Sequence, residues 1–355
     1  MKRKFIYRQF LLLTALLAAG VVSCDKEPEE VVPMEPEIGV SVMDAEETRA
    51  AVLYESTAGL RSEMTHEGGG SAFIHTDAYW DGTTTKYFNS HIFYFEAVTN
   101  WRFADGGGNI VHFYWPPDDS YLNFLAYAPE TLTYTGVTIG SYTDRVPTFN
   151  CNLPVADNQT FSSGAISMKE FIYAFEAHKN KTNDSESAVP LQFRHPLAAV
   201  YISIASAKQR MTLNSVTFKR IYKKGTGTYN SVGPTTDWHP DTSDGTIDFT
   251  ISIGGVMGTD MHTGSTYGPF IVMPQDMTGR TELADIKMVV NYTPYGGAAT
   301  NSSEISITSP TTTAWAPSKK YTYALDLGTD DGAVNVNISV TDWDNRGSYT
   351  ETDVD

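Results

Sequence analysis

Cysteine is almost absent from this sequence, with two copies among 355 residues. The chain must therefore be stabilised by packing rather than by a framework of disulfides. Basic residues are also few, with 25 lysines and arginines against 42 aspartates and glutamates and a formal net charge of −17. Nucleic acid and anionic membrane surfaces attract basic proteins, so we expect neither nucleic acid nor an anionic membrane face as a partner.

Sequence motifs for catalysis and for cofactor binding are missing as well. There is no G-x-S-x-G nucleophile elbow, no H-E-x-x-H pair and no phosphate-binding P-loop. The eight histidines are scattered, and no two have the spacing of a helical metal site. We expect no enzyme activity, no metal and no cofactor. A hydrolase that uses two carboxylates remains an alternative, but only acidic residues in turn-like contexts favour it.

The first residues that are informative form a targeting signal. Four basic residues within the first eight precede an apolar run at positions 10–22, which is the layout of a secretory signal peptide at residues 1–23. A transmembrane helix needs about 20 apolar residues, more than this run provides. The run ends in V-V-S-C, which resembles the lipobox of bacterial lipoproteins, with Val21 in place of the usual leucine. The alternative is an ordinary signal peptide with a chance cysteine.

A lipobox implies handling by the lipoprotein export machinery and a lipid on Cys24. The acidic residues directly after Cys24 resemble a tag that sends some lipoproteins to the outer leaflet. We therefore predict an outer membrane lipoprotein precursor that is held by its lipid anchor. Positions 24–36, rich in Glu, Pro and Val, are typical of a solvated tether.

Beyond the tether, short runs of alternating apolar and polar residues predict β-strands. Aromatic residues at 12% and charged residues at 19% predict a folded chain with real cores. Residues 168–178 fit a helix or a strand, and the pattern leaves the choice open. Many short strands indicate an all-β sandwich or small barrel. The strands expected most clearly are Ile92 to Phe95, Ile110 to Tyr114, Leu122 to Tyr127, Val200 to Ile204, Ile247 to Ile253, Ile286 to Tyr292, Tyr321 to Leu327 and Val334 to Val340.

The chain is long enough for two domains, and its most polar interior stretch, at positions 180–187, marks the predicted boundary. The predicted division is a tether plus first strand at 24–49, an N-terminal β-sandwich at 50–186 and a C-terminal β-sandwich at 187–355. The one cysteine left after lipidation of Cys24 is Cys151, which we expect to be a small buried apolar residue.

One group of aromatic side chains has two interpretations. Trp101, Phe103, Phe113, Tyr114 and Trp115 lie close together in the sequence, and such rings can stack on sugars. Most rings in strands fill a core or pair across strands, so we prefer a core role.

A further segment of interest lies at positions 38–49, IGVSVMDAEETR. Ile38, Val40 and Val42 alternate with Gly, Ser and Met, which predicts a strand with one apolar face. The charged linker that follows ends at Arg49, before Ala50, and offers an arginine-specific protease a site. An edge strand followed by a loop explains the same residues equally well.

A resemblance decides between these readings. Its features, in chain order, are the lipoprotein start, Thr48 to Ala50, Trp115-Pro116, Leu122 to Pro129, Glu170 to Ala174, Phe193 to Ala198, Met273 to Gln275, Trp315 to Tyr323, a final strand and Trp343. Together they resemble the fimbrillin family, the pilins of type V fimbriae, in its Mfa-like branch. The resemblance implies two transthyretin-like β-sandwich domains in tandem and no enzyme activity. It also implies cleavage after Arg49 by an arginine-specific surface protease, and assembly with other fimbrial subunits by β-strand addition in a cell-surface fimbrium that serves adhesion.

The physical basis of such an assembly can be stated from the residues. A strand with three buried apolar side chains contributes roughly 1.5 to 3 kcal/mol for each of them. Its removal leaves a hydrophobic groove bordered by unpaired backbone groups, and a strand from another subunit can restore both. Ile38, Val40 and Val42 are the predicted removable strand.

The last residues bear on the kind of subunit. The family's stalk subunits carry a donor segment beyond the last strand, but the tail DWDNRGSYTETDVD offers only Tyr349 and Val354 as apolar plugs. A tip subunit needs a groove and no donor, so we expect a tip or accessory subunit rather than a stalk subunit. The rival class is a monomeric surface glycan-binding lipoprotein that uses exposed aromatic residues.

Overall fold

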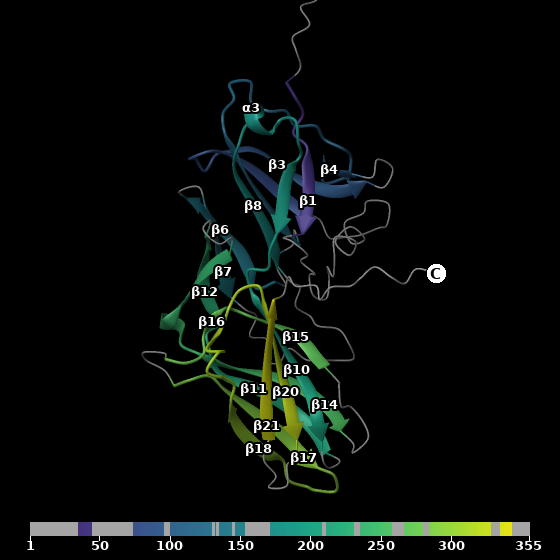
Figure 1. The fold of residues 1–355 in the computed structure, drawn as a ribbon, viewed down its shortest axis with the longest axis vertical. Coiled ribbons are helices and arrows are strands. Elements are labelled where there is room, and N and C mark those ends of the chain that lie inside the picture. The colour runs from purple at the N-terminus through teal and green to yellow at the C-terminus, as the bar shows by residue number, and fades with distance from the viewer. Residues whose placement is uncertain are drawn as a thin grey trace, which may run out of the picture. The chain divides into compact units, whose positions relative to one another are not determined.

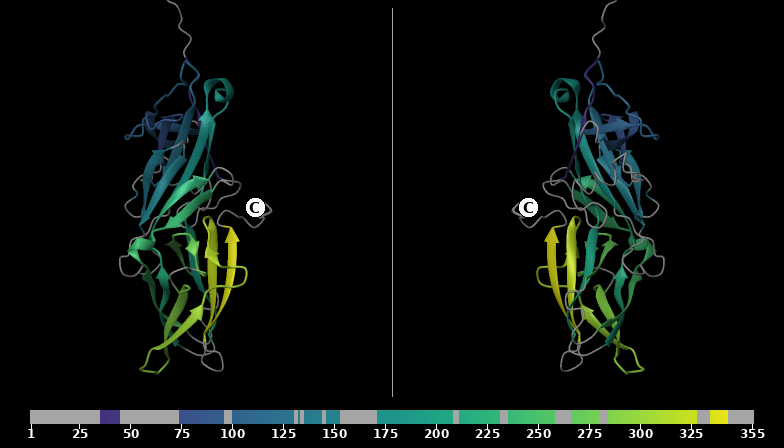
Figure 2. Two further views of the ribbon diagram at one scale, coloured as in Figure 1. Left: turned by 90° about the vertical axis from the view of Figure 1, so that its left-hand side faces the viewer. Right: turned by 90° about the vertical axis from the view of Figure 1, so that its right-hand side faces the viewer.

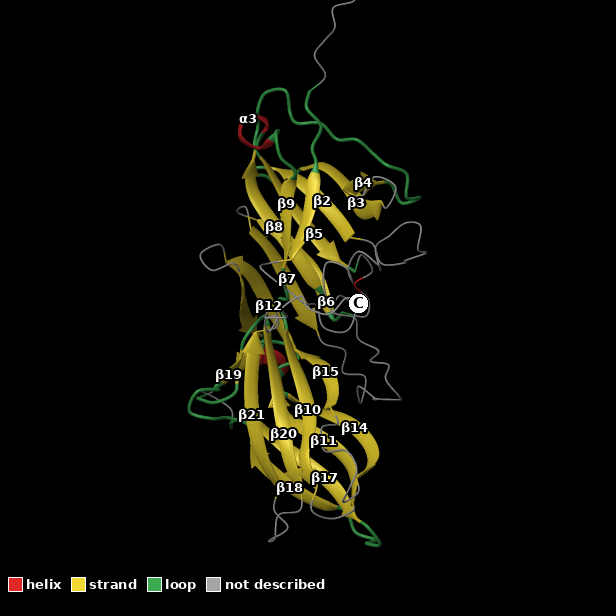
Figure 3. Cartoon of the chain, turned by 45° about the vertical axis from the view of Figure 1, so that its right-hand side comes forward, coloured by secondary structure: helices red, strands yellow, loops and turns green. Residues whose placement is uncertain are grey.

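The computed structural model describes residues 35–44, 74–95, 100–129, 132, 135–143, 146–152, 171–207, 211–230, 235–257, 266–279, 284–327 and 334–342. Strands dominate these residues, and the described helical residues are α3 (Lys181–Asp184), the 3-10 turn η4 (Thr242–Asp244) and Leu132, which also has 3-10 geometry (Figure 3). The expected all-β fold class is confirmed. No helix within the described ranges is long and apolar enough to cross a membrane.

A five-stranded antiparallel sheet is at the centre of the N-terminal half. Its strands, in spatial order, are β4 (Asn100–Ala104), β3 (Lys86–Phe95), β2 (Ile74–Trp80), β5 (Leu122–Ala128) and β8 (Ile172–Lys179). Side chains alternate between the faces of a strand. On β8, Ile172 and Ala174 pack on one face, while Tyr173 and Phe175 pack on the other. Both faces of this sheet are therefore buried along β8, and β2 and β5 also contribute side chains to both clusters.

One face is covered by a two-stranded parallel sheet of β1 (Val40–Asp44) and β9 (Val189–Phe193). β1 is the purple strand in Figure 1, and β9 is labelled in Figure 3. The hydrophobic cluster between the two layers is here called the β1 core. Its buried residues are Ile38, Val40, Val42, Ile74, Ala78, Phe88, Ile92, Trp101, Phe103, Trp115, Leu122, Phe124, Ala126, Ala128, Ile172, Ala174, Val189, Leu191 and Phe193.

The other face packs in a second cluster, here called the shared core because its residues come from both sides of position 187. A four-stranded sheet contributes to it, in the order β13 (Thr235–Pro240), β12 (Lys224–Asn230), β7 (Val146–Asn152) and β6 (Val137–Thr143). Cys151 on β7 is buried in this core, as expected of a small apolar residue. β12 pairs with β7, so backbone hydrogen bonds also join the two halves of the sequence.

The C-terminal half contains two facing four-stranded sheets (Figure 2). One has the order β15 (Thr266–Val272), β10 (Ala198–Ala207), β20 (Lys319–Leu327) and β21 (Val334–Asp342). The other has the order β14 (Ile247–Met257), β11 (Met211–Ile221), β17 (Lys287–Pro294) and β18 (Asn301–Ser306). Their inner side chains form a third cluster, the C-terminal core. Beside it, β16 (Gln275–Asp276) pairs with β19 (Ala314–Trp315).

Most of the strands expected from alternation are confirmed, namely those at Ile92 to Phe95, Leu122 to Tyr127, Val200 to Ile204, Ile247 to Ile253, Ile286 to Tyr292, Tyr321 to Leu327 and Val334 to Val340. The open choice at 168–178 is decided in favour of a strand from Ile172 onward by β8, and residues 168–170 lie outside the described residues. The strand expected at Ile110 to Tyr114 is wrong. Val111 N–H donates to the Phe103 carbonyl, whereas the Phe113 carbonyl accepts from Ile38 N–H. The segment therefore changes partners and forms isolated bridges instead of a ladder.

The polar stretch that marked the expected domain boundary contains α3 and leads into β9. β9 contributes to the β1 core, although it follows position 187. The division into 50–186 and 187–355 stays a prediction.

Candidate functional site

β1 is held on β9 by a parallel ladder. The register places Val40 opposite Val189 and Val42 opposite Leu191, so apolar side chains face the core in matched rows. Val189 N–H donates to the Gly39 carbonyl at 2.8 Å, which extends the ladder one residue before β1. The strand that we expected in this segment is confirmed.

The apolar face of β1 continues at Ile38, two residues before the strand, and is buried almost completely. The exposed fractions of Ile38, Val40 and Val42 are 1%, 2% and 6%, whereas Ser41 between them is half-buried. Burial of each of the three side chains contributes roughly 1.5 to 3 kcal/mol, as an upper estimate. The total stability of a domain is only about 5 to 15 kcal/mol. On this scale, burial of the three side chains is a large contribution to the free energy of unfolding.

The residues just before β1 make a second set of contacts, on the side away from β9. Ile38 N–H donates to the Phe113 carbonyl at 2.8 Å, and Glu37 forms an antiparallel bridge with Tyr114. The Glu37 carboxylate Oε1 lies 2.9 Å from His112 Nδ1 and 4.0 Å from Arg102 Nη1. The start of β1 thus lies between two backbone partners, β9 on one side and residues 113–114 on the other.

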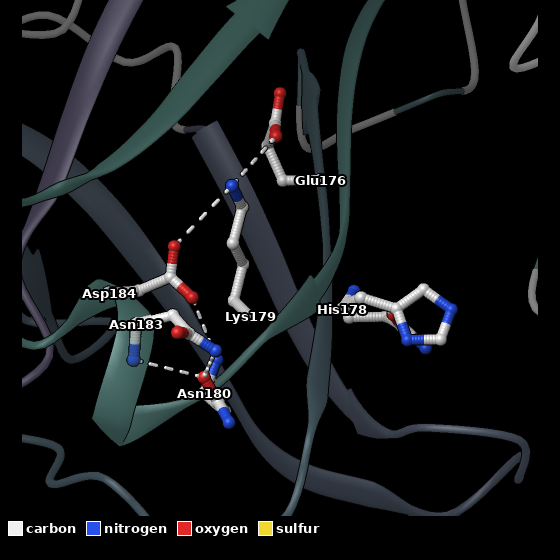
Figure 4. Close-up of polar contacts among 7 residues, drawn as sticks. Glu176, His178, Lys179, Asn180, Asn183 and Asp184 are labelled. Atoms are coloured by element: carbon white, nitrogen blue, oxygen red, sulfur yellow. Dashed lines mark hydrogen bonds and ion pairs between the residues drawn. The ribbon is translucent and has the colours of Figure 1, made fainter.

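The beginning of β9 is fixed by a polar network around α3 (Figure 4). Lys179 Nζ lies 3.6 Å from a carboxylate oxygen of Glu176 and 3.6 Å from one of Asp184. Asn180 caps the helix, because its side-chain oxygen accepts from Asn183 N–H at 3.1 Å. Asn180 N–H in turn donates to Asp184 Oδ2 at 2.9 Å. Since α3 joins β8 to β9, these contacts fix where β9 starts relative to the five-stranded sheet.

Glu176 is the residue of this network whose charge is unfavourable in the folded state. Burial raises the pKa of its carboxyl above the usual value, and the nearby cations of Lys179 and Arg194 only partly offset this effect. The Lys179 ammonium can pair with Asp184 without Glu176. The charge on Glu176 is therefore a cost that the fold carries at neutral pH.

A separate polar cluster lies on β2. Asp77 is buried, and its carboxylate lies 2.7 Å from Lys86 Nζ and 3.1 Å from His75 Nε2, while Tyr79 Oη donates to it at 3.1 Å. Burial alone would raise the pKa of Asp77, but the hydrogen bonds from His75 and Lys86 outweigh it and hold the pKa below its usual value. A histidine, a lysine and a tyrosine around one carboxylate form a network that ties adjacent strands together.

The structure describes some of the site residues predicted from the sequence and not others. Ile38, Val40 and Val42 meet in the β1 core, whereas Cys24, Arg49 and Ala50 lie outside the described residues. Within the described ranges no group of three or more metal-binding side chains gathers.

The core interpretation holds for four of the five aromatic residues, whereas Tyr114 is half-buried and is not a member of the core cluster. Trp101, Phe103 and Trp115 are buried in the β1 core, and Phe113 packs against it, stacked on Phe88 with ring centroids 3.8 Å apart. These rings are not available for stacking on a sugar.

Sequence reasoning missed the partner of β1. Val189, Leu191 and Phe193 alternate in the sequence V-P-L-Q-F, but Pro190 interrupts the pattern of a strand. The alternation was the signal that could have found it.

Comparison with known proteins agrees with this architecture. A family model described as fimbrillin-like matches residues 65–343. A fimbrial protein from Bacteroides vulgatus superposes with a TM-score of 0.50 at 15% identity, over 87% of this chain and 99% of that chain. A fimbrilin from Porphyromonas gingivalis gives a TM-score of 0.42 at 10% identity, over 88% of this chain and 99% of that chain. Among curated proteins, none matches. Since the matched range spans most of its length, the chain belongs to the fimbrillin-like family.

Proposed function

We propose that the protein is a subunit of a cell-surface fimbrium that assembles by exchange of β1 for a strand of another subunit. It is exported as a lipoprotein through Cys24 and held at the outer membrane by its lipid. An arginine-specific surface protease then cuts between Arg49 and Ala50, and the segment that carries β1 leaves. The assembled subunit contributes to adhesion, without catalytic residues and without a cofactor.

The observation that carries this proposal is the place of β1 in the fold. Together with Ile38 it supplies three buried side chains to a layer that has two strands among the described residues, and it is followed by a linker that ends in Arg49. A strand at that position is connected to the rest of the chain on one side by the segment that would be cut. Its departure leaves Val189, Leu191 and Phe193 beside an open groove, and an incoming strand restores both burial and hydrogen bonds.

The processing step is tested by Arg49→Ala in the native host. The variant should remain full length and unassembled, because β1 stays covalently attached. Arg61→Ala is the matched control, since it removes the next arginine along the chain and should be processed and incorporated normally. Incorporation of the Arg49→Ala variant into fibres at the normal level would defeat the proposal.

We place the subunit at the tip or in an accessory position, because its tail after β21 is a poor donor strand. Deletion of Gly347 to Asp355 separates the roles. A tip or accessory subunit without this segment should still join the fimbrium, whereas a stalk subunit should stop elongation. Counting subunits in purified fimbriae measures the difference.

The alternative of a monomeric glycan-binding lipoprotein loses its main candidates, since Trp101, Phe103 and Trp115 are interior. Affinity electrophoresis on polysaccharides tests it directly. Retardation of the uncut monomer, with no assembly after cleavage, would favour the alternative.

A further inference from the structure

The two edges of β9 are chemically different. Along a strand, successive residues direct their N–H and C=O groups to opposite edges. Val189 N–H points to β1, since it donates to the Gly39 carbonyl, and the register assigns the same direction to Leu191 and Phe193. Pro190 and Gln192 therefore direct their backbone nitrogens to the edge of β9 that faces away from β1, here called the far edge.

The far edge cannot hold a complete strand. Pro190 has no N–H, so one ladder hydrogen bond is missing there. At the other end of the same edge, Arg194 and Tyr173 exchange two backbone hydrogen bonds, with N–O distances of 2.8 Å and 3.1 Å. Between these two positions Gln192 alone directs an N–H outward. Edge strands of natural sheets are often protected in this way against unwanted pairing.

The edge of β9 that faces β1, here called the near edge, has the opposite character. It offers regular backbone donors and acceptors, and residues 113–114 offer further ones on the other side of the strand. A strand in the place of β1 pairs with Val189, Leu191 and Phe193, and its start also reaches the Phe113 carbonyl. The position of Gly39 sits close against Ala188, since a Cβ there would lie 3.4 Å from the Ala188 Cβ. A small side chain fits this position.

The near edge also has a charge at one end. His112 and Arg102 face the Glu37 carboxylate, which directly precedes the first buried side chain of the strand. The two groups are partly exposed, so they contribute orientation more than affinity. They favour an acidic residue at the end of the occupant that lies beside them, which in β1 is the amino end.

We propose that Pro190 and the Tyr173–Arg194 bridge restrict β9 to one edge for strand addition. That edge takes a strand of another fimbrial subunit that runs parallel to β9. The strand carries, from its amino end, an acidic residue, an apolar residue, a small residue and two further apolar residues at alternate positions. This inference rests on the proposed strand exchange and adds the direction and the side-chain pattern of the partner strand.

The direction is tested with two labelled peptides of identical composition. One has the sequence of residues 37–44, EIGVSVMD, and the other is its reverse, DMVSVGIE. Each is offered to the protein after cleavage at Arg49, with the uncut chain as a control whose groove is occupied. The forward peptide should bind at least about tenfold more tightly to the cut protein than the reverse peptide. Equal binding or preference for the reverse peptide would overturn the inferred direction.

The same experiment separates this inference from the proposed function. A cut protein that still assembles with other subunits but prefers the reverse peptide contradicts the direction alone. A cut protein that neither binds a peptide nor assembles contradicts strand exchange itself, and the inference falls with it.

The role of Pro190 is tested in the uncut chain by Pro190→Val, which restores an N–H to the far edge. This variant should form dimers or larger species in light scattering at concentrations where the unaltered chain is monomeric. Ser41→Val is the matched control, because Ser41 lies opposite Pro190 in the ladder and the change adds an apolar side chain without adding a donor. Circular dichroism verifies that both variants are folded. A folded Pro190→Val variant that stays monomeric would show that Pro190 does not protect the edge.

Discussion

The β1 core and the C-terminal core are both closed by two layers of strands, but the layers are built differently. In the C-terminal core each layer has four strands, and all of them come from residues 198–342. Among the described residues, one layer of the β1 core consists of β1 and β9, and these two strands are far apart in the sequence. Loss of β1 removes half of a layer, whereas loss of an edge strand such as β21 would leave three strands in place.

The outer strands of the two cores also differ in burial. Ile38, Val40 and Val42 are buried, but along β21 the apolar side chains become more exposed toward the end, and Val340 is 40% exposed. The strand next to the predicted cut is thus more deeply buried in its core than β21 is in the C-terminal core. A strand that is predicted to be removable can therefore stabilise the fold strongly while it is in place.

The largest effect is expected from a charge placed on β1. Ile38→Asp buries a carboxylate without a partner and should lower the free energy of unfolding by roughly 3 to 5 kcal/mol. Val340→Asp, the corresponding change on β21, should cost less than about 1 kcal/mol, because the side chain reaches solvent. Urea unfolding of both variants measures the difference. Similar costs would break the contrast between the two strands.

A smaller effect is expected from truncation of the same residue type in both strands. Ile38→Ala should cost about 2 to 5 kcal/mol, since the cavity lies in a closed core. Ile338 on β21 is only partly buried, and Ile338→Ala should cost less than half as much. Thermal or urea unfolding can rank the pair, and a reversed order would count against the burial argument.

Acid should weaken the N-terminal half first. Asp77 has a depressed pKa in the folded state, so its contribution to stability is present above its unfolded pKa of about 3.9 and is lost as the pH falls through the lower folded value. Asp77 is 4% exposed, and it lies outside the C-terminal core. Unfolding of Asp77→Asn should depend less on pH below about pH 4 than that of the unaltered protein. The same pH slope in both proteins would contradict the assigned network.

The smallest effect is expected at Glu176. Its pKa is raised in the folded state, so the charged carboxylate opposes folding at neutral pH and the protonated form does not. Glu176→Gln should therefore stabilise the protein slightly at pH 7 and have no effect well below the unfolded pKa of about 4.3. Asp184→Asn is a useful comparison, because Lys179 then keeps only Glu176 as a partner. Destabilisation by Glu176→Gln at pH 7 would show that its pairing with Lys179 outweighs its burial.

The sequence was sufficient for some of these features and insufficient for others, for physical reasons. Alternation at Ile38, Val40 and Val42 predicted the apolar face of β1, because the period of a strand is local. The partner of β1 was not predictable in this way, since parallel pairing joins distant segments and Pro190 breaks the local pattern of β9. The same limit explains the false strand at 110–114, where alternation is present but the hydrogen-bond partners change.

The polar networks were harder to foresee. His75, Asp77 and Tyr79 alternate on β2, so their common face could be read from the sequence, but the contact with Lys86 depends on how β2 pairs with β3. The contacts of Lys179 with both Glu176 and Asp184 depend on α3, whose cap at Asn180 is local but whose position between two strands is not.

Amide hydrogen exchange at Val189 and Leu191 measures whether the edge of β9 that faces β1 opens when β1 leaves. Both N–H groups face β1, so they should exchange slowly in the uncut protein and rapidly once cleavage at Arg49 has released residues 24–49. Protection should return when the subunit is incorporated into a fimbrium. Slow exchange that persists after β1 has left and before any assembly would contradict the account, because the near edge of β9 would then have closed without a replacement strand.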